Sequence, residues 1–361
     1  MPFYRSTLQD TSGGGGGGGD VWGSIYVKYE SIDDYFTQNP PQISLGNNRI
    51  FASLNNIENA SALTEIKFGN GVNAISSVFY GYSYFNCPIN LFNTFSLTYA
   101  ISCVGNCFNY NSQIEFPNFI QCPPHTQYSS YVNIAYNWIF ANCNNYNQPT
   151  TIRIHARPGD DSSDLYGYFD DVFYNCKNLN SKIIFDIFKY NYNNEISDTE
   201  ILNHSLSDFF CGCSNFNQPM IFYPGASLYR TFSGCHNYNQ PVVCDFRNSY
   251  FERMFDGANN MSSDIIFLHS NDEQLYYPTF NGMISNMSRG NSINIYIYNM
   301  TNIKQDNIVA NVSVVPTWTA VTNGFYNSTY NIYLLNNVED ALNNFNNYYH
   351  NFYGEYPIFF D

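Results

Sequence analysis

The chain has 361 residues, of which 12% are charged and 19% aromatic, and its formal net charge is -15. Such an excess of negative charge repels phosphate backbones and anionic lipid, which argues against nucleic-acid and membrane-surface binding. No apolar run is long enough to span a bilayer, and the first ten residues lack the basic and apolar parts of a signal peptide. We therefore expect neither a membrane anchor nor conventional export.

A run of seven consecutive glycines, Gly13 to Gly19 with Gly16 at its centre, follows the first residues. Such a run loses much backbone entropy on ordering and is typical of a flexible linker. Two interpretations remain open: a linker without a further role, or a tether that lets residues 1–12 dock into a larger assembly. The sequence thus predicts an N-terminal anchor segment with a polyglycine linker at 1–30, followed by an N-terminal cap or first coils at 31–75.

A ten-residue motif recurs further along, with Phe first, Cys fourth, Tyr or Phe seventh and Asn-Gln-Pro at its end. The copies are complete at 140–149, 210–219 and 232–241, looser at 173–182, and degenerate or weak at 255–261, 104–111 and 79–88. Such repeats predict a stack of similar units. The positions expected to face the core are Phe140, Cys143, Tyr146, Phe173, Cys176, Phe210, Cys213, Phe216, Phe232, Cys235, Tyr238, Phe255 and Ala258. The positions expected to form a polar turn are Asn147, Gln148, Pro149, Asn217, Gln218, Pro219, Asn239, Gln240 and Pro241.

The spacing of the motif is irregular. Cys213 and Cys235 are 22 residues apart, whereas Cys107 and Cys143 are 36 apart, so the longer units should carry inserted loops. The segments 155–164 and 190–195 have the composition of such loops.

Each unit is flanked by two short elements. The motif is followed by stretches of branched and aromatic residues that predict strands, at 151–155, 183–185, 220–223, 242–244, 265–268, 293–298 and 331–335. The apolar residues before the motif, as in 206–210 and 228–232, fall at the spacing of one helical turn. We therefore predict a repeat solenoid over 76–335, with one short parallel strand and one short helical turn per repeat, and irregular loops.

The last residues have a different pattern. Val338, Ala341, Leu342, Phe345 and Tyr349 lie at helical spacing, which predicts a capping helix over 336–361. Stacked repeats need such a cap at an open end.

Candidate sites for catalysis or metal binding are weak. Asp160, Asp161 and Asp164 could hold Ca²⁺ or supply a carboxylate pair, but their spacing matches no EF-hand, which favours a solvated loop. Cys211 and Cys213 could bind zinc but lack a second Cys or His pair at finger-like spacing, which favours burial as reduced thiols. We expect no catalytic residue, no cofactor and no metal site.

The complete motifs resemble the BspA-like leucine-rich repeats of bacterial surface proteins, mycoplasmas and some protists, whose consensus reads Met-Phe-x-x-Cys/Ala-x-x-Phe-Asn-Gln-Pro-Leu. The match is carried by 140–149, 210–219 and 232–241, where Asn-Gln-Pro keeps one register with Cys. The chain departs from the family in its irregular spacing and in lacking a Trp-Asp-x-Ser-x-Val segment after the strand. The resemblance implies a leucine-rich-repeat-like solenoid that serves adhesion or recognition.

Several functions fit these features. A phage virion protein needs no signal peptide because lysis releases it, so the leading hypothesis is a non-enzymatic structural or adhesive phage component (fibre, decoration or receptor-binding protein). Its expected partners are other virion proteins, through the N-terminal segment, and a host surface glycan or protein; a homo-oligomer is also compatible. The alternatives are a cell-surface adhesin of a bacterium or protist, and a phage polysaccharide depolymerase on a solenoid scaffold. Tyr and Asn are adaptable recognition residues, although many tyrosines must pack the core.

Overall fold

The computed structural model describes residues 43–45, 66–68, 72–92, 94, 97–122, 131–157, 164–190, 196–201, 203–222, 226–245, 250–268, 283, 292–298 and 329–335. The polyglycine linker with Gly13, Gly16 and Gly19, the expected inserted segments 158–163 and 191–195, and the expected capping helix at 336–361 lie outside these residues. Of the expected N-terminal cap, only short pieces near 43–45 and 66–75 are described.

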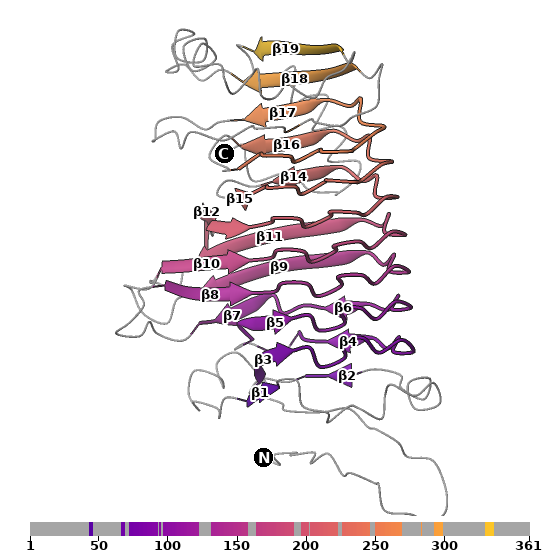
Figure 1. The fold of residues 1–361 in the computed structure, drawn as a ribbon. Coiled ribbons are helices and arrows are strands. Elements are labelled where there is room, and N and C mark those ends of the chain that lie inside the picture. The colour runs from indigo at the N-terminus through magenta and orange to yellow at the C-terminus, as the bar shows by residue number, and fades with distance from the viewer. Residues whose placement is uncertain are drawn as a thin grey trace, which may run out of the picture. The chain divides into compact units, whose positions relative to one another are not determined.

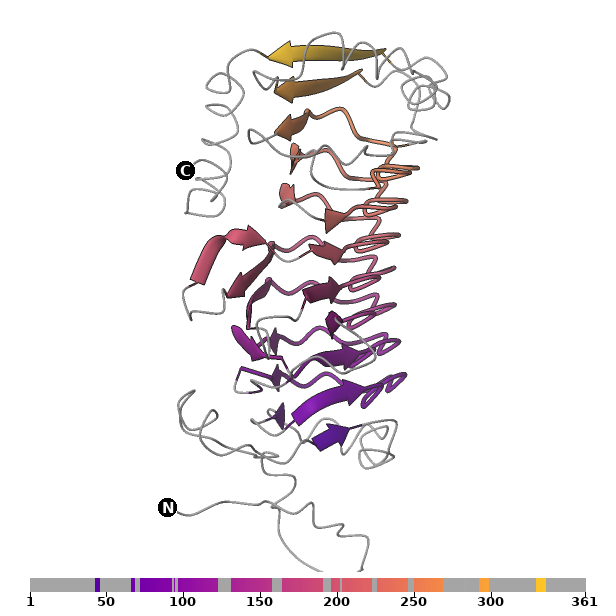
Figure 2. The same ribbon diagram turned by 90° about the vertical axis from the view of Figure 1, so that its left-hand side faces the viewer.

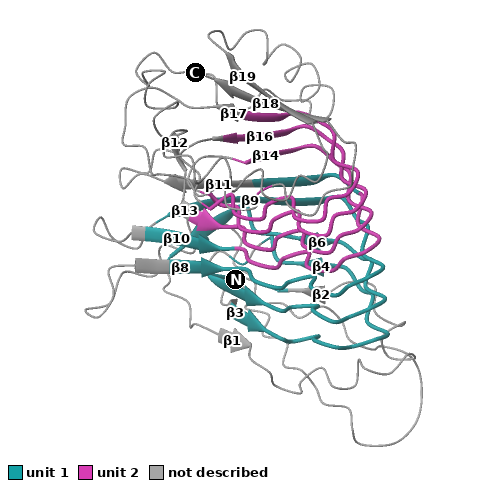
Figure 3. Cartoon of the chain, turned by 45° about the horizontal axis from the view of Figure 1, so that its top comes forward, with its two compact units in different colours: residues 1–168, 181–200 teal, residues 169–180, 201–361 magenta. Residues whose placement is uncertain are grey.

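The chain forms two compact units. Unit 1 comprises residues 1–168 and 181–200, and unit 2 comprises residues 169–180 and 201–361 (Figure 3). Both are rich in strands, and the strands with defined partners pair in parallel. This confirms the predicted strand-rich fold with parallel sheets, which is compatible with a repeat architecture.

Unit 1 contains three groups of strands. One sheet has the parallel order β1 (Ile43–Leu45), β3 (Val72–Ser76), β5 (Tyr99–Ile101), β8 (Tyr131–Ala135) and β10 (Asp164–Tyr168). A second consists of β2 (Ile66–Lys67), β4 (Ile89–Asn90) and β6 (Ile114–Glu115). The third has the order β12 (Ile196–Ile201), β11 (Ile183–Tyr190), β9 (Thr150–Arg157) and β7 (Phe119–Gln121). Strand β9 alternates between buried and more exposed residues, as a strand with one face in the core must.

Unit 2 contains a five-stranded parallel sheet with the order β14 (Met220–Phe222), β16 (Val242–Asp245), β17 (Ile265–Leu268), β18 (Ser292–Tyr298) and β19 (Thr329–Leu335) (Figure 1). A second parallel pair joins β13 (Asn203–Ser205) and β15 (Ala226–Ser227). Strands thus occur at every stretch that the sequence predicted to be one. The expected loop 155–164 needs correction, because His155 to Arg157 continue β9.

The expected helical turns are not confirmed. No residue in the described ranges is helical, so none of them forms a helix that could cross a membrane. Where a helical turn was expected before the motif, the chain instead runs through a short strand, such as β15, into consecutive β-turns. Apolar residues three to four apart had suggested a helical turn. A β-turn produces the same spacing, because it also brings residues i and i+3 together.

We call the run of β-turns and polar residues that lies ahead of the following strand, as 208–219 lies ahead of β14, a turn segment. Turn segments lie at 77–88, 102–113 and 138–149 in unit 1, and at 171–180, 208–219, 230–241 and 253–264 in unit 2. Figure 2 shows the narrow turn segments lying one above another within each unit.

The core inside the turn segments is a column of aromatic rings. In unit 2, Phe210 stacks on Phe216 of its own turn segment at 4.2 Å between ring centroids, and on Phe232 of the next segment at 5.5 Å. Phe232 in turn stacks on Phe255 at 5.3 Å. Unit 1 repeats the arrangement, with Phe140 on Tyr146 at 4.2 Å. Offset stacking of this kind adds to the free energy of burying the rings.

Candidate functional site

Each turn segment needs two residues with left-handed backbone. Cys213 N donates to Phe210 O at 2.9 Å, closing a four-residue turn whose third residue, Gly212, has a φ of 77°. Asp208, with a φ of 56°, occupies the same place in the turn before it. The corresponding pairs are Ser77 and Gly81, Ser102 and Asn106, Trp138 and Asn142, Asp171 and Asn175, Arg230 and Gly234, and Arg253 and Gly257. The second member is Gly or Asn in each, the residues that adopt this conformation at least cost.

This requirement gives a prediction at Gly212. A Cβ atom there would make only ordinary contact, 3.4 Å from Asn175 Cα, so the cost of substitution comes from the backbone. Gly212→Ala should lower the free energy of unfolding by about 1 kcal/mol, because a left-handed Ala is strained. Gly212→Asn should cost clearly less, since Asn tolerates this region. Urea unfolding of both variants tests the ordering, and equal losses would contradict it.

The predicted core positions of the motif, Phe140 through Ala258, are all fully buried. Three of the cysteines among them, Cys143, Cys213 and Cys235, also donate a hydrogen bond to an adjacent turn segment of the same unit. Cys143 Sγ lies 3.0 Å from Val104 O, and Cys235 Sγ lies 3.0 Å from Phe210 O. Burial raises the pKa of both thiols well above the usual range. A protonated, buried thiol is a poor nucleophile and metal ligand, so these cysteines act as small core side chains.

All ten cysteines are buried and free of disulfides. Cys211 is the motif-region thiol nearest to charged groups: Arg230 Nη2 lies 3.7 Å from its Sγ, and Arg230 Nε lies 3.2 Å from Asp208 Oδ1. Burial, helped by the Asp208 charge, raises the pKa of Cys211 to about 11. The described ranges hold no group of three or more His, Cys, Asp or Glu side chains that could bind a metal ion.

The Asn at the eighth position of the motif forms what we call the Asn ladder, consisting of Asn86, Asn111 and Asn147 in unit 1 and Asn180, Asn217 and Asn239 in unit 2. Five of its members accept a hydrogen bond from a backbone N–H group of the next turn segment, and Asn147 Oδ1 accepts from Ser181 Oγ at 2.9 Å. Asn217 Oδ1 accepts from Asn239 N at 2.7 Å, and Asn239 Oδ1 accepts from Ser262 N at 2.8 Å. In unit 1, Asn111 Oδ1 accepts from Asn147 N in the same way at 2.8 Å. The predicted polar turns therefore join neighbouring repeats, with Pro149 exposed and Pro219 buried.

Beside the Asn ladder, Gln148 and Gln218 also reach the preceding Asn. Gln148 Nε2 donates to Asn111 Oδ1 at 3.2 Å, and Gln218 Nε2 donates to Asn180 O at 2.8 Å. Gln240 and Pro241 are half-buried at the corresponding place. These amides hold the turns and leave recognition to other side chains.

A polar cluster in unit 2 surrounds Asp170. Asp170 Oδ1 accepts from Ser205 Oγ and, at 3.1 Å, from Ser207 N, and the two serine hydroxyls lie 3.0 Å apart. Burial raises the pKa of Asp170 above its usual value although these hydrogen bonds oppose the shift. Of the acidic residues that the sequence singled out, Asp164 begins β10, and Asp160 and Asp161 lie outside the described residues.

The raised pKa of Asp170 gives a pH dependence. A carboxyl group that holds its proton more tightly in the folded state stabilises most below its unfolded pKa, and that stability is lost as pH rises through the folded pKa. Asp170→Asn keeps an oxygen acceptor for Ser207 N without the charge. We therefore expect it to be more stable than wild type at pH 7 and to flatten the decline in unfolding temperature above pH 4. A steeper decline in the variant would show that the charge of Asp170 is favourable.

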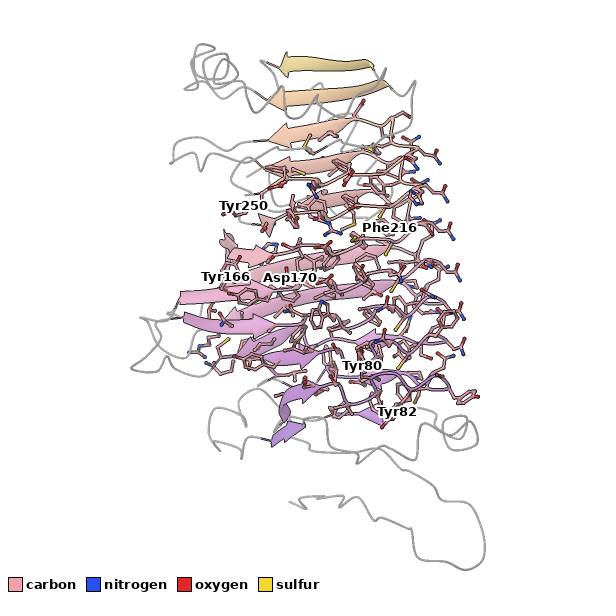
Figure 4. All side chains as sticks on the ribbon, viewed as in Figure 1. Tyr80, Tyr82, Tyr166, Asp170, Phe216 and Tyr250 are labelled. Atoms are coloured by element: carbon pink, nitrogen blue, oxygen red, sulfur yellow. The ribbon has the colours of Figure 1, made fainter. Side chains whose placement is uncertain are left out.

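Exposed aromatic rings gather on unit 1. The described large apolar side chains that are exposed there are Tyr80, Tyr84, Phe92, Tyr99, Phe108, Trp138 and Tyr168, against Tyr174 and Tyr250 in unit 2. Tyr80, Tyr84, Phe108 and Trp138 come from three turn segments of unit 1, and each is about half exposed. Figure 4 labels Tyr80 on the first of these segments. Rings that leave a face open to solvent can bind apolar surface of a partner.

Backbone hydrogen bonds place these three turn segments next to one another. Gly81 N donates to Gly105 O at 2.8 Å, and Asn106 N donates to Ala141 O at 2.7 Å. The sequence shows that aromatic residues are abundant but does not separate exposed rings from buried ones. Tyr80, Phe108 and Trp138 fall outside the core positions of the repeat, which excludes them from the aromatic column without showing whether a neighbouring segment covers them.

Comparisons with family models, with curated proteins and with solved structures gave no match to this chain.

Proposed function

We propose that this chain is a non-enzymatic binding and structural component of a phage particle, built on a BspA-like leucine-rich-repeat solenoid. In this proposal the parallel strands, the aromatic column and the Asn ladder form the scaffold. Residues 1–12 dock into other virion proteins, the polyglycine linker tethers them to the rest of the chain, and the body contacts a host surface.

The observation that supports this proposal best is the contrast between interior and surface in unit 1. Its rings Phe140 and Tyr146 are fully buried in the scaffold, while Tyr80, Phe108 and Trp138 are about half exposed on adjoining turn segments. A ring that faces solvent adds little to the stability of the scaffold, because it removes little apolar surface from water. Exposed aromatic side chains are, however, the usual anchors of a binding surface.

Two measurements test the proposal. Mass spectrometry of purified particles should find the chain, and removal of residues 1–19 should prevent its incorporation. The purified chain should bind host cells and leave their surface polysaccharide intact. Its absence from particles, combined with presence on a bacterial or protist surface, would favour the adhesin. Shortened polysaccharide chains after incubation would favour the depolymerase.

A further inference from the structure

Two residues with exposed rings, Tyr80 and Trp138, contact the place where a side chain at Gly105 would lie. Gly105 lies in the middle one of the three adjoining turn segments and is buried. A Cβ atom on it would lie 3.2 Å from Tyr80 Cδ2, on the preceding segment, and 3.2 Å from Trp138 O, on the following one. The ring of Tyr80 therefore lies across Gly105, and any larger residue at 105 would displace that ring. We call Tyr80, Gly105 and Trp138 the aromatic platform.

Trp138 has a backbone conformation that is unfavourable for a bulky residue. Its φ is 57°, in the left-handed region where a bulky side chain is strained, and its side chain is 49% exposed. The equivalent residues in the other turn segments are Ser, Asp or Arg. Half of the Trp138 side chain is therefore exposed to solvent at a position where Asn or Asp would be less strained.

The stretch of sequence that contains the platform carries almost no charge. Between Lys67 and Arg153 the sequence contains one Asp, Glu, Lys or Arg residue, Glu115, whose carboxylate accepts a hydrogen bond from Asn90. The net charge of -15 is therefore located elsewhere in the chain. An anionic ligand would find no cation in this segment, and a cationic ligand would find a single carboxylate.

Amide groups next to the rings supply hydrogen-bonding capacity. Asn106 follows Gly105 directly, is half-buried, and accepts from Asn142 Nδ2 at 2.8 Å. Within the described ranges its own Nδ2 group donates to no other residue, so it is available to an external acceptor. An amide beside an aromatic face matches a ligand that presents a C–H face and hydroxyl groups together.

From these observations we infer that the aromatic platform binds a neutral oligosaccharide. The proposal rests on the proposed binding function and names the ligand class. Tyr80 and Trp138 lie on segments two strand spacings apart, about 10 Å by the usual distance between paired strands, which suits a chain of more than one sugar ring. A protein partner would bury about 800 Å² of surface on this side around an apolar centre, whereas here single exposed rings lie among amide side chains.

The test measures binding of the full chain to an array of neutral glucose, galactose, mannose and N-acetylglucosamine oligosaccharides, with sialylated and sulfated ones for comparison. We expect binding to a neutral member, with a Kd that changes less than about twofold between about 0.1 and 1 M NaCl. Tyr80→Ala and Trp138→Asn should each raise this Kd about tenfold. The matched control is Tyr250→Ala, which removes an exposed tyrosine from unit 2 and should leave the Kd unchanged.

The unfolding temperature of the variants shows whether Trp138 serves binding or the stability of the fold. Trp138→Asn relieves a strained left-handed residue, so its unfolding temperature should equal or exceed that of wild type while binding weakens. Gly105→Ala provides a second variant, because it displaces the Tyr80 ring without removing it, and should also weaken binding.

The outcomes distinguish the two proposals. Binding only to charged oligosaccharides, or unchanged binding in Tyr80→Ala and Trp138→Asn, would overturn the neutral-glycan inference even if the chain binds host cells. Failure to bind cells and absence from particles would overturn the proposed function itself.

Discussion

Phe232→Ala should lower the free energy of unfolding by about 4 kcal/mol, the usual cost of truncating a fully buried Phe whose surroundings cannot collapse into the space. Phe232 is fully buried and stacks on Phe210, Tyr238 and Phe255. Its removal therefore interrupts the aromatic column within its own turn segment and at both neighbouring turn segments of unit 2. Urea or thermal unfolding followed by circular dichroism measures the change.

The control for this prediction is Tyr250→Ala. Tyr250 belongs to the same unit but is 55% exposed, so its truncation should change the free energy of unfolding by no more than about 0.5 kcal/mol. A loss at Tyr250 comparable to that at Phe232 would show that the column is not the main stabilising element. Unfolding of unit 2 should also remain cooperative in the control.

Asn217→Ala should cost about 1–2 kcal/mol, because it removes the acceptor of a backbone N–H group that has no other recorded partner. Asn217 Oδ1 accepts from Asn239 N at 2.7 Å in the next turn segment. Loss of this bond leaves Asn239 N to be satisfied by water, at a position that is half-buried. The effect should appear both as a lower unfolding midpoint and as faster amide exchange at Asn239.

The chain offers a matched control two residues away. Asn215 lies in the same turn segment, is exposed, and its Oδ1 accepts only from the side-chain amide of Asn237 at 3.0 Å. Asn215→Ala leaves only the exposed Asn237 Nδ2 group to bind water instead, so it should cost less than about 0.5 kcal/mol. If Asn215→Ala proved as costly as Asn217→Ala, the capping of backbone groups would not explain the Asn ladder.

Much of the scaffold could be predicted because it depends on short-range patterns. The recurrence of Phe, Cys and a second aromatic residue, as at Phe232, Cys235 and Tyr238, marks the buried side of each turn segment. The branched and aromatic stretches, such as the one that became β17, mark strands. Both features need only the local sequence and its repetition.

The helical turn was predicted from apolar spacing and was not confirmed, for a physical reason. Consecutive β-turns with left-handed residues at their third positions also place residues i and i+3 together. The Gly or Asn directly before each motif Cys, as at Gly212 or Asn142, is the sequence signal for such turns. Apolar periodicity alone does not contain this information, because it ignores the sign of φ.

The aromatic platform could not be derived from the sequence. Tyr80, Gly105 and Trp138 come from three different turn segments, and only the stacking of those segments brings the Tyr80 ring over Gly105. Composition showed that Tyr and Phe are abundant, but the division between a buried ring such as Tyr146 and an exposed one such as Tyr80 depends on the neighbouring segment.

The sequence by itself therefore determined the repeat, the positions of the strands that follow the motif and the low charge between Lys67 and Arg153, because these follow from residue type and order. Only the tertiary structure decided which carbonyl accepts a hydrogen bond from each thiol, which backbone N–H group donates to each Asn, and which rings remain exposed. Those properties depend on the register between neighbouring segments, and register is set by the packing of the whole stack.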